Sequence, residues 1–494
     1  MKRCILTILA CCLSSSASAQ QIDVFICLSG SWSDVSCWCQ ATASDGLNQS
    51  GVTNSTTSEC DHGLPEPGED VDVLLQGVLL FDMSATVGTM DLLGLGPDVS
   101  VFSQAENDLA ATLETVSWYC QYTQTGGTNT VSTSSSTGLL DVLGNYELDQ
   151  DGSITADIEN LFVMPNPPPG SGASPGAFKQ TGGTNTVTVL EMGVLPAFLV
   201  PGGTYTLTGG NLSAHYEFIG AWSDSGEFDQ SGGTNKITST SSGLGGQLLL
   251  GRDANSTGVY YLDAGNLSAG TEVVAQNGTA VIGQSGGQNT VTNLIVGQSS
   301  GGVGGHYQLN QGTLQANGVV VGAAGAGTFV QTGGTAQVNG DLQIGQSSGG
   351  SGRYSLNGSG KLTVTGNEIV GPAESSLFFQ YPGTTNTVSQ TLTIESENSM
   401  PGVNGYYLKG GMLIANSIVN NGMFEYQGGV IIGDVTNNNI FWVEELTFIP
   451  GTALIIGGNL TNDGYISCSS SGRVTKLRVL GTYTNHGHDN GCVE

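Results

Sequence analysis

A repeated segment places the strongest constraint on how this chain can fold. QTGGTNTV begins at Gln124 and again at Gln180, and four weaker copies follow, so that successive copies are 56, 50, 54, 47 and 49 residues apart. A second motif lies between them, in forms such as GTYTLTGGNLSA, GVYYLDAGNLSAG and GHYQLNQGTLQA. The two motifs align, with Gln180 on Leu207 and Asn185 on Leu212, so the true repeat unit is mostly about 22 to about 32 residues long.

Each unit has the pattern of two short strands joined by a tight turn. An aromatic residue and then Gln or Leu precede a Gly-Gly pair, and Asn or Leu followed by Val or Ala comes after it. Period-two alternation is typical of strands, and Gly-Gly marks a turn. A unit of this length cannot bury its apolar face alone, so it must stack on copies of itself. We therefore predict an all-β protein, a parallel β-helix (β-solenoid) with three strands per coil over residues 71–480.

A kelch-type propeller is the alternative fold, because its blades have a period of about 50 residues. The half-period argues against it, since two alignable units in each period leave each unit too short for a four-stranded blade. The five Trp residues also do not recur once in each repeat.

The composition excludes several function classes. Gly accounts for 77 of 494 residues without a three-residue period, which excludes collagen, and an apolar share of 38% is too high for plain disorder. Asp and Glu number 41 against 11 Lys and Arg, giving a formal net charge of −30. Such a charge repels phosphate backbones and anionic lipids, so we expect no nucleic-acid partner and no membrane insertion. The carboxylates are expected to keep a repetitive β protein soluble.

The two ends of the chain differ from the repeats. Residues 1–19, MKRCILTILACCLSSSASA, have a basic start, a short apolar core and an A-x-A ending, which predicts a secretory signal peptide. A lipoprotein signal ending at Cys11 is the alternative. We expect residues 20–70 to form a Cys-rich entry or cap segment and residues 481–494 to form a C-terminal tail or cap. The expected location is outside the cell or on its surface, with the periplasm as an alternative.

Export to an oxidising compartment favours disulfides among the seven cysteines that follow the signal peptide. Four of them lie in the first sixty residues, and we predict that they pair with one another to close the N-terminal end of the solenoid: Cys27, Cys37, Cys39 and Cys60. Three connectivities are open for these four. A metal clip at Cys37 and Cys39 is the alternative interpretation.

The last two cysteines are separated by one coil length. Cys468 and Cys492 lie about 24 residues apart, so we predict that they occupy equivalent places on consecutive coils and form a disulfide. Stacked strands are about 4.8 Å apart, which is within the range that a disulfide spans. This pairing would leave Cys120 as the odd thiol.

The alignment also predicts buried amides in every second coil. If the repeated face is inward, Gln180 and Asn185 are buried where the next coil has leucines, and buried amides need hydrogen-bond partners. We predict that these two residues and their equivalents bond to turn backbone or to stacked neighbours.

The repeats resemble those of bacterial autotransporter passenger regions and related secreted repeat proteins. The resemblance covers about residues 122–433, and the opening GSWSDVSCWC followed by LPEPGEDVDVLL resembles the entry segment of such solenoids. It implies a right-handed β-helix outside the cell, often with an adhesive or scaffolding role. The closing TYTNHGHDNGCVE does not resemble the family's C-terminal barrel, and the family motif is structural, so it implies no functional residue.

Three features resemble chemical sites. ELDQDGSITADIE resembles a calcium-binding EF-hand loop, but Ile158 stands where a bidentate acid is needed, and the repeat explains the segment better. The tail HGHDNGC carries metal-ligating residue types but is short and polar. Asp224, Glu227 and Asp229 with Lys236 are the acid-rich patch that lies near a base. We predict no catalytic residue, no metal site and no cofactor.

Three function classes remain. We favour a secreted structural or adhesive β-solenoid without catalytic chemistry, whose partners are extracellular polysaccharide or other surface proteins. A polysaccharide lyase or glycosidase would need a pair of carboxylates, or acids with a base beside them. A carbohydrate-binding protein without catalysis is the third class.

Overall fold

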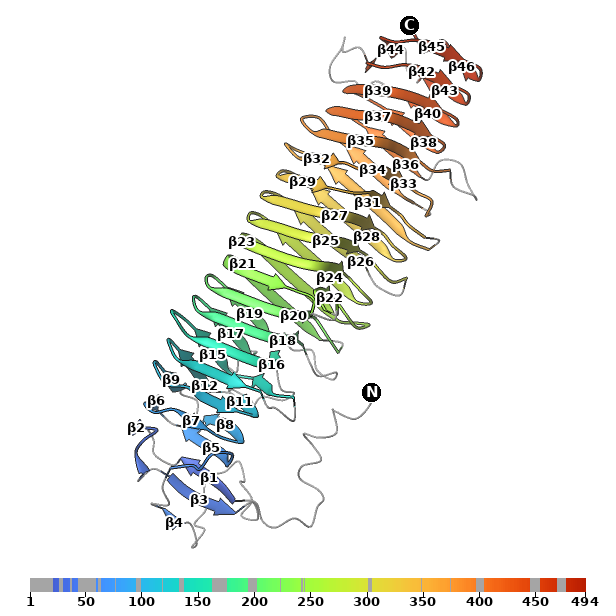
Figure 1. The fold of residues 1–494 in the computed structure, drawn as a ribbon. Helices are drawn as coiled ribbons and strands as arrows, with labels where there is room; N and C mark the ends of the chain where they lie inside the picture. The colour runs from blue at the N-terminus through green and yellow to red at the C-terminus, as the bar shows by residue number, and fades with distance from the viewer. Residues whose placement is uncertain are drawn as a thin grey trace.

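The protein is an all-β parallel solenoid in the computed structural model, and Figure 1 shows it as one elongated stack of strands with the first strands, β1–β4, and the last strands, β44–β46, at opposite ends. The structure describes residues 21–25, 30–35, 38–42, 59–60, 64–75, 77–94, 99–117, 119–132, 137–161, 176–193, 202–222, 224–240, 243, 245–300, 304–347, 349–373, 375–396, 404–444, 454–468 and 477–494. Among these residues there is no helix with the length and apolar character that a membrane span requires.

The strands stack in three parallel ladders, which we call A, B and C in the order in which each coil enters them. Ladder A contains the aromatic positions of the repeat. Its strands are β2 (Gly30–Ser31), β6 (Val78–Phe81), β9 (Ser100–Gln104), β12 (Cys120–Gln124), β15 (Asn145–Leu148), β17 (Ala177–Gln180), β19 (Thr204–Leu207), the first parts of β21 (Ser225–Ile237) and β23 (Thr257–Val274), β24 (Thr279–Gln284), β26 (Gly304–Leu309), β28 (Ala326–Gln331), β31 (Ser351–Leu356), β34 (Leu377–Gln380), β36 (Gly405–Leu408), β38 (Met423–Tyr426), β40 (Ile440–Val443), β43 (Tyr465–Cys468) and β46 (His488–Asp489).

Ladder B follows the Gly-Gly turn. Its strands are β7 (Ala85–Thr86), β10 (Leu109–Ala111), β13 (Thr128–Val131), the first parts of β16 (Ser153–Leu161), β18 (Thr184–Met192) and β20 (Asn211–Ile219), later parts of β21 and β23, the first parts of β25 (Gln288–Val296) and β27 (Thr313–Val321), β29 (Thr335–Val338), β32 (Lys361–Val364), the first parts of β35 (Thr385–Ile394), β37 (Met412–Asn420) and β39 (Val430–Asn437), β41 (Leu454–Ile456) and β44 (Leu477–Val479).

Ladder C completes each coil. Its strands are β1 (Gln21–Phe25), β5 (Asp70–Leu75), β8 (Thr89–Gly94), β11 (Leu113–Val116), β14 (Leu139–Val142), β22 (Gln247–Leu250), β30 (Leu342–Ile344), β33 (Glu368–Val370), β42 (Leu460–Asn462), β45 (Tyr483–Asn485) and the closing parts of β16, β18, β20, β23, β25, β27, β35, β37 and β39.

The strand register confirms the alignment of the two motifs. Gln180 pairs with Leu207 between β17 and β19, and Asn185 pairs with Leu212 between β18 and β20. The parallel pairing of consecutive coils confirms the solenoid and excludes the propeller.

Coil length differs from the prediction near the C-terminus. Asn420 and Asn437 are paired in the register of β37 and β39 and hydrogen-bonded at 2.7 Å, although they are only 17 residues apart. The rings of Tyr406, Phe424 and Phe441 still stack across these short coils. The coils can therefore shorten without interrupting the ladders.

Stacked aromatic rings fill the core along ladder A. Tyr146, Phe178, Tyr205, Phe228 and Tyr260 pack face to face, with ring centroids 4.6 to 4.9 Å apart and interplanar angles of 3° to 8°. The spacing follows from the strand separation of about 4.8 Å, because each ring projects from the same register position as the ring below it. Ile282 interrupts the stacked rings between Tyr260 and Tyr307, but the buried residues of the described chain still form one continuous core.

The Gly-Gly turns bring consecutive coils into close backbone contact. Gly183 has a φ of +63°, a conformation that favours glycine. At Gly182 a β-carbon would lie 2.5 Å from the backbone nitrogen of Gln150 in the coil below. The turn therefore needs both glycines, one for its conformation and one for the space.

The described residues near the N-terminus continue the stack. Strand β1 pairs in parallel with β5 and antiparallel with β3 (Trp38–Thr42), and β3 pairs antiparallel with β4 (Glu59–Cys60). Trp32 is buried against Trp38, Phe81 and Phe102, with ring centroids 4.8, 5.2 and 6.1 Å away.

Candidate functional sites

The predicted cysteine sites have different outcomes. Cys27 and Cys37 lie outside the described residues, and Cys39 and Cys60 are opposite each other in the register of β3 and β4. The disulfide-rich cap over residues 20–70 therefore stays a prediction.

The C-terminal disulfide is present. Cys468 and Cys492 are joined with their Cα atoms 5.8 Å apart. The two positions are not strictly equivalent, because the register that places Ile466 on Asp489 puts Cys468 one residue out of step with Cys492. Cys120 is a free, buried thiol, and burial raises its pKa to about 12.

The predicted amide Gln180 is fully buried and hydrogen-bonded, as expected. Its Nε2 donates to the backbone carbonyl of Gly183 in its own turn at 3.3 Å and to that of Asn211 in the next coil at 3.0 Å. Its Oε1 accepts a 2.6 Å hydrogen bond from the Tyr205 hydroxyl. Gln180 thus links two coils through turn backbone and through one buried hydroxyl.

The predicted amide Asn185 is also fully buried, and its partners are side chains of the neighbouring coils and not turn backbone. Its Nδ2 donates to Oε2 of Glu159 at 2.9 Å and to the Tyr205 hydroxyl at 3.2 Å. Glu159 belongs to the coil below and Tyr205 to the coil above. We call the set of Gln180, Asn185, Glu159 and Tyr205 a core quartet, because its four members join three consecutive coils inside the solenoid.

The core quartet recurs four more times. In each copy the same donors and acceptors meet: tyrosine hydroxyl to glutamine, and asparagine to both glutamate and tyrosine. The other quartets are Gln124, Asn129, Glu114 and Tyr146; Gln230, Asn235, Glu217 and Tyr260; Gln284, Asn289, Glu272 and Tyr307; and Gln380, Asn386, Glu368 and Tyr406.

The five quartet glutamates are fully buried between apolar neighbours. Glu159 lies in ladder C between Leu140 and Leu190, and Glu217 lies between Leu190 and Leu248. Burial raises the pKa of each carboxyl above its ordinary value, and the hydrogen bond from asparagine offsets only part of that rise. The resulting pKa is about 8 for Glu114, about 7 for Glu159, about 8 for Glu217, about 7 for Glu272 and about 8 for Glu368.

Two coils keep the glutamine and the tyrosine without the asparagine and the glutamate. In the first, Gln104 accepts a 2.6 Å hydrogen bond from the Tyr122 hydroxyl, and Leu109 and Met90 stand at the other two positions.

The second lies inside the row of quartets and is its natural exception. Gln331 still accepts a 2.8 Å hydrogen bond from the Tyr354 hydroxyl. The asparagine position of that coil is Ala336, and the glutamate position below it is Val319. The asparagine and the glutamate are therefore lost together, while the glutamine and the tyrosine remain.

The quartet glutamates were not predicted from the sequence, where the acids were interpreted as solubilising surface groups. The sequence does contain a signal for four of them. In these coils an aliphatic residue stands at the position where other coils have asparagine, and the glutamate follows it by five residues, as in LAATLE, ITADIE, LSAHYE and LSAGTE. The alternation of Glu with Leu in ladder C matches the alternation of Gln or Asn with Leu in the other two ladders.

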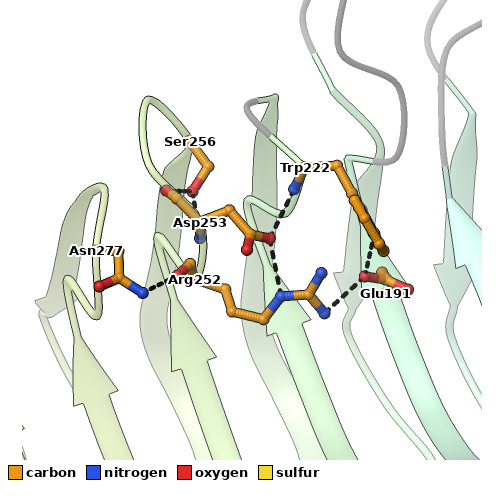
Figure 2. Close-up of polar contacts among 6 residues, drawn as sticks. All are labelled: Glu191, Trp222, Arg252, Asp253, Ser256 and Asn277. Atoms are coloured by element: carbon orange, nitrogen blue, oxygen red, sulfur yellow. Dashed lines mark hydrogen bonds and ion pairs between the residues drawn. The ribbon is translucent and has the colours of Figure 1, made fainter. Parts of the chain in front are cut away.

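A polar cluster stands on the outside of the solenoid at the corner between ladders C and A (Figure 2). The Arg252 guanidinium contacts Glu191 at 2.8 Å and Asp253 at 2.9 Å, and it lies 4.5 Å from the ring centroid of Phe218. Trp222 donates from its indole to Glu191 at 2.7 Å and from its backbone to Asp253 at 2.9 Å. The guanidinium is shared by two carboxylates and the contacts join three coils, so the cluster acts as a surface clamp.

Aromatic side chains also stack on the outer face of ladder A. The Phe379 and Tyr407 rings are 4.8 Å apart and nearly parallel, and the Arg353 guanidinium lies 4.6 Å from the centroid of Phe379. The two faces of the Phe379 ring are therefore covered by Tyr407 and by the cation.

The outer face of ladder C is hollowed around Gly318. A β-carbon at this glycine would meet only Oδ1 of Asn293 at 3.7 Å, and the hollow is lined by Ile295 and Val320 with Asn293 and Asp341 at its polar part. An aliphatic surface beside amide and carboxylate groups can contact a sugar ring and its hydroxyls.

The other sequence motifs do not form a site in the described part of the chain. Asp149 of the EF-hand-like segment accepts a 2.7 Å hydrogen bond from the Thr181 hydroxyl in a turn between coils. His486 contacts Asp463 at 2.8 Å. No group of three His, Cys, Asp or Glu residues arranged to hold a metal occurs among the described residues.

The acid-rich patch is not assembled around its base. Asp229 is in ladder A and Lys236 is in ladder B, and among the described residues no ion pair joins Lys236 to Asp224, Glu227 or Asp229. Burial, with Glu227 and Asp263 nearby, raises the pKa of Asp229.

No protein-family model, curated protein or solved structure matches this chain.

Proposed function

We propose that this protein is a secreted, non-catalytic β-solenoid that serves as a structural or adhesive rod on the bacterial cell exterior. The observation that carries the proposal is the continuity of the stack: the three ladders run from coil to coil without division into separate domains (Figure 1). A rod of this kind holds its two ends at a fixed distance. The resemblance of its repeats to autotransporter passenger regions supports an extracellular location.

The polar clusters also support a mechanical role. The core quartets and the Arg252 clamp each join three consecutive coils, so pulling one coil away breaks bonds on both of its sides. The formal charge of −30 keeps such rods apart from one another and from anionic surfaces.

The experiment that tests this function uses the producing bacterium. A strain lacking the protein is compared with the wild type for attachment to abiotic and polysaccharide surfaces, and surface protease treatment of intact cells is used to locate the protein. We expect the protein to be removed by protease and attachment to fall in the deletion strain. Full protection from protease in intact cells, with unchanged attachment, would reject the proposal.

Non-catalytic carbohydrate binding is the second candidate, and the hollow around Gly318 favours it. Binding of the purified protein to a glycan array, with loss of binding in Gly318→Leu, would support this candidate. Release of reducing ends from a polysaccharide panel would instead indicate the enzyme alternative, a β-helix lyase or glycosidase.

A further inference from the structure

The carboxyl groups of the core quartets are not explained by a structural or adhesive function. Glu114, Glu159, Glu217, Glu272 and Glu368 are each fully buried, and an ionised carboxylate in such a place is costly unless a cation or several donors surround it. Each carboxyl receives hydrogen bonds from one asparagine.

The groups that face each glutamate carry no positive charge among the described residues. Tyrosines face all five, and Glu217 also lies near Glu159 and Glu272. Burial raises the pKa of these tyrosines well above its ordinary value, so they remain neutral. Nothing around the five carboxyls in the described part of the chain therefore compensates a negative charge.

The hydrogen-bond pattern leaves matched atoms without partners. Within the described residues, Oε1 of Glu159 and Oδ1 of Asn185 are both buried and unbonded, although the other atoms of the two groups are joined at 2.9 Å. The same pair of unbonded oxygens occurs in three more quartets: Glu114 with Asn129, Glu217 with Asn235, and Glu272 with Asn289. Two buried acceptors on adjoining groups are unfavourable unless a proton lies between them.

We propose that each quartet glutamate is a neutral carboxylic acid that forms a cyclic pair with its asparagine, and that these pairs lock the coils at acidic and neutral pH and release them at alkaline pH. In the cyclic pair, Nδ2–H of asparagine donates to Oε2 of glutamate, and the acidic O–H at Oε1 donates to Oδ1 of asparagine. Both unbonded oxygens of those four quartets are then satisfied. In the fifth, Nδ2 of Asn386 donates to both oxygens of Glu368, and the acidic O–H satisfies the unbonded Oδ1 of Asn386.

The natural exception supports this pairing. A glutamate whose only role was to carry a charge would not need an asparagine in the next coil. In the exceptional coil, however, Val319 replaces the acid and Ala336 replaces the amide together. The acid and the amide behave as one unit, whereas the tyrosine and glutamine bond persists without them.

The direction of the pH effect follows from where the proton is held. An exposed glutamate in the unfolded chain has its ordinary pKa near 4.5, and the folded pKa values lie at about 7 to 8. Between these two pKa values the folded state binds more protons than the unfolded state. The stability that each pair contributes is therefore complete below pH 4.5, falls as the pH rises, and is lost once the pH has passed through 7 to 8. The unfolding equilibrium constant increases about tenfold per pH unit for each glutamate in this window.

The test compares the full chain with a variant in which all five glutamates are replaced by glutamine. Glutamine keeps the cyclic pair, since its amide donates to Oδ1 and accepts from Nδ2, but it cannot ionise. Thermal unfolding is followed from pH 5 to pH 9. We expect the difference between the two unfolding temperatures to be smallest at pH 5, to grow steadily up to about pH 8 and to stay constant above it, with the glutamine variant the more stable.

Outer-face acids provide the background for this comparison, because burial also raises the pKa of Asp72 and of Asp141 to about 6. They are unchanged in both proteins, so only the difference between the two curves reports the quartets. The exposed Glu106→Gln serves as the control and should leave the curve unchanged. Parallel curves for the wild type and the five-site variant would overturn the proposal.

Infrared spectroscopy gives a second readout that needs no folded variant. A band from buried protonated carboxyl groups should be present in the wild type at pH 6.5, where exposed carboxyls are ionised, and should vanish at alkaline pH. A spectrum at pH 6.5 that contains only ionised carboxylates would overturn the proposal even if the variant failed to fold.

Discussion

The coupling between Asn185 and Glu159 gives a quantitative prediction about the core. Asn185→Ala removes the donor of two hydrogen bonds, one to Glu159 at 2.9 Å and one to the Tyr205 hydroxyl at 3.2 Å. The carboxyl of Glu159 is then buried without a donor, which costs about 1 to 3 kcal/mol, and the truncation adds the cost of a cavity. We expect Asn185→Ala to lower the free energy of unfolding by about 3 to 5 kcal/mol.

Removing the acid as well should recover part of that loss. Glu159→Val leaves the Asn185 amide short of one acceptor, so alone it should cost about 2 to 4 kcal/mol. The double variant has the pair found naturally at Ala336 and Val319, and the Tyr205 hydroxyl keeps its bond to Gln180. Its cost should be smaller than the sum of the two single costs by about 1 to 3 kcal/mol.

Urea denaturation followed by circular dichroism measures the three free energies at pH 6, where the acid is neutral. Because repeat proteins can open locally, hydrogen exchange of peptides from β16, β18 and β20 reports the same change in the coils concerned. The reverse experiment uses Ala336→Asn, which should destabilise alone and less so together with Val319→Glu. Costs that add to within about 0.5 kcal/mol in both cycles would refute the coupling.

Three further predictions concern single positions. Cys492→Ser opens a 24-residue loop and should lower stability by about 3 kcal/mol in the chain-entropy model, with faster proteolysis of the last coil; unchanged proteolysis would contradict this role of the bond to Cys468. Cys120, buried with a pKa of about 12, should react with iodoacetamide at pH 8 only after denaturation, and rapid labelling of the native protein would show that the thiol is accessible. Gly182→Ala places a β-carbon 2.5 Å from a backbone atom and should be strongly destabilising. Gly318→Ala, in a strand, places a β-carbon no closer than 3.7 Å to any neighbouring atom and should be tolerated. Equal melting temperatures for the two variants would contradict the close packing of the turns.

The ladders were predictable because the repeat encodes the register. Each aromatic residue fixes one rung of ladder A, and the Gly-Gly pair fixes the start of ladder B, so aligning Gln180 with Leu207 was enough to give their pairing. The burial of Gln180 and Asn185 followed from the same alignment. The strand after the second motif carries a weaker pattern, and for this reason ladder C was assigned no register from sequence.

The site was only partly predictable for a physical reason. A glutamate is ordinarily exposed, and composition alone does not separate Glu159, which is neutral in the core, from an exposed acid such as Glu227. The partners of Asn185 come from coils 26 and 20 residues away, and local sequence does not specify contacts at such separations. The short coil that sets Asn437 on Asn420 keeps its Gly-Gly pairs at Gly410 and Gly428, but its length differs from that of the units whose alignment gave the repeat, so it was not predicted.

The alternation of coils limits the lengths that this rod can adopt. Deleting one coil, from Phe178 to the residue before Tyr205, would set Glu217 directly on Glu159 at a separation of about 4.8 Å and would remove the amide of Asn185. Deleting two coils in the region of the quartets keeps each quartet glutamate next to an aliphatic rung of ladder C. Viable insertions, deletions and duplications in that region should therefore come in steps of two coils, which explains why the sequence there repeats at about twice the length of a single coil.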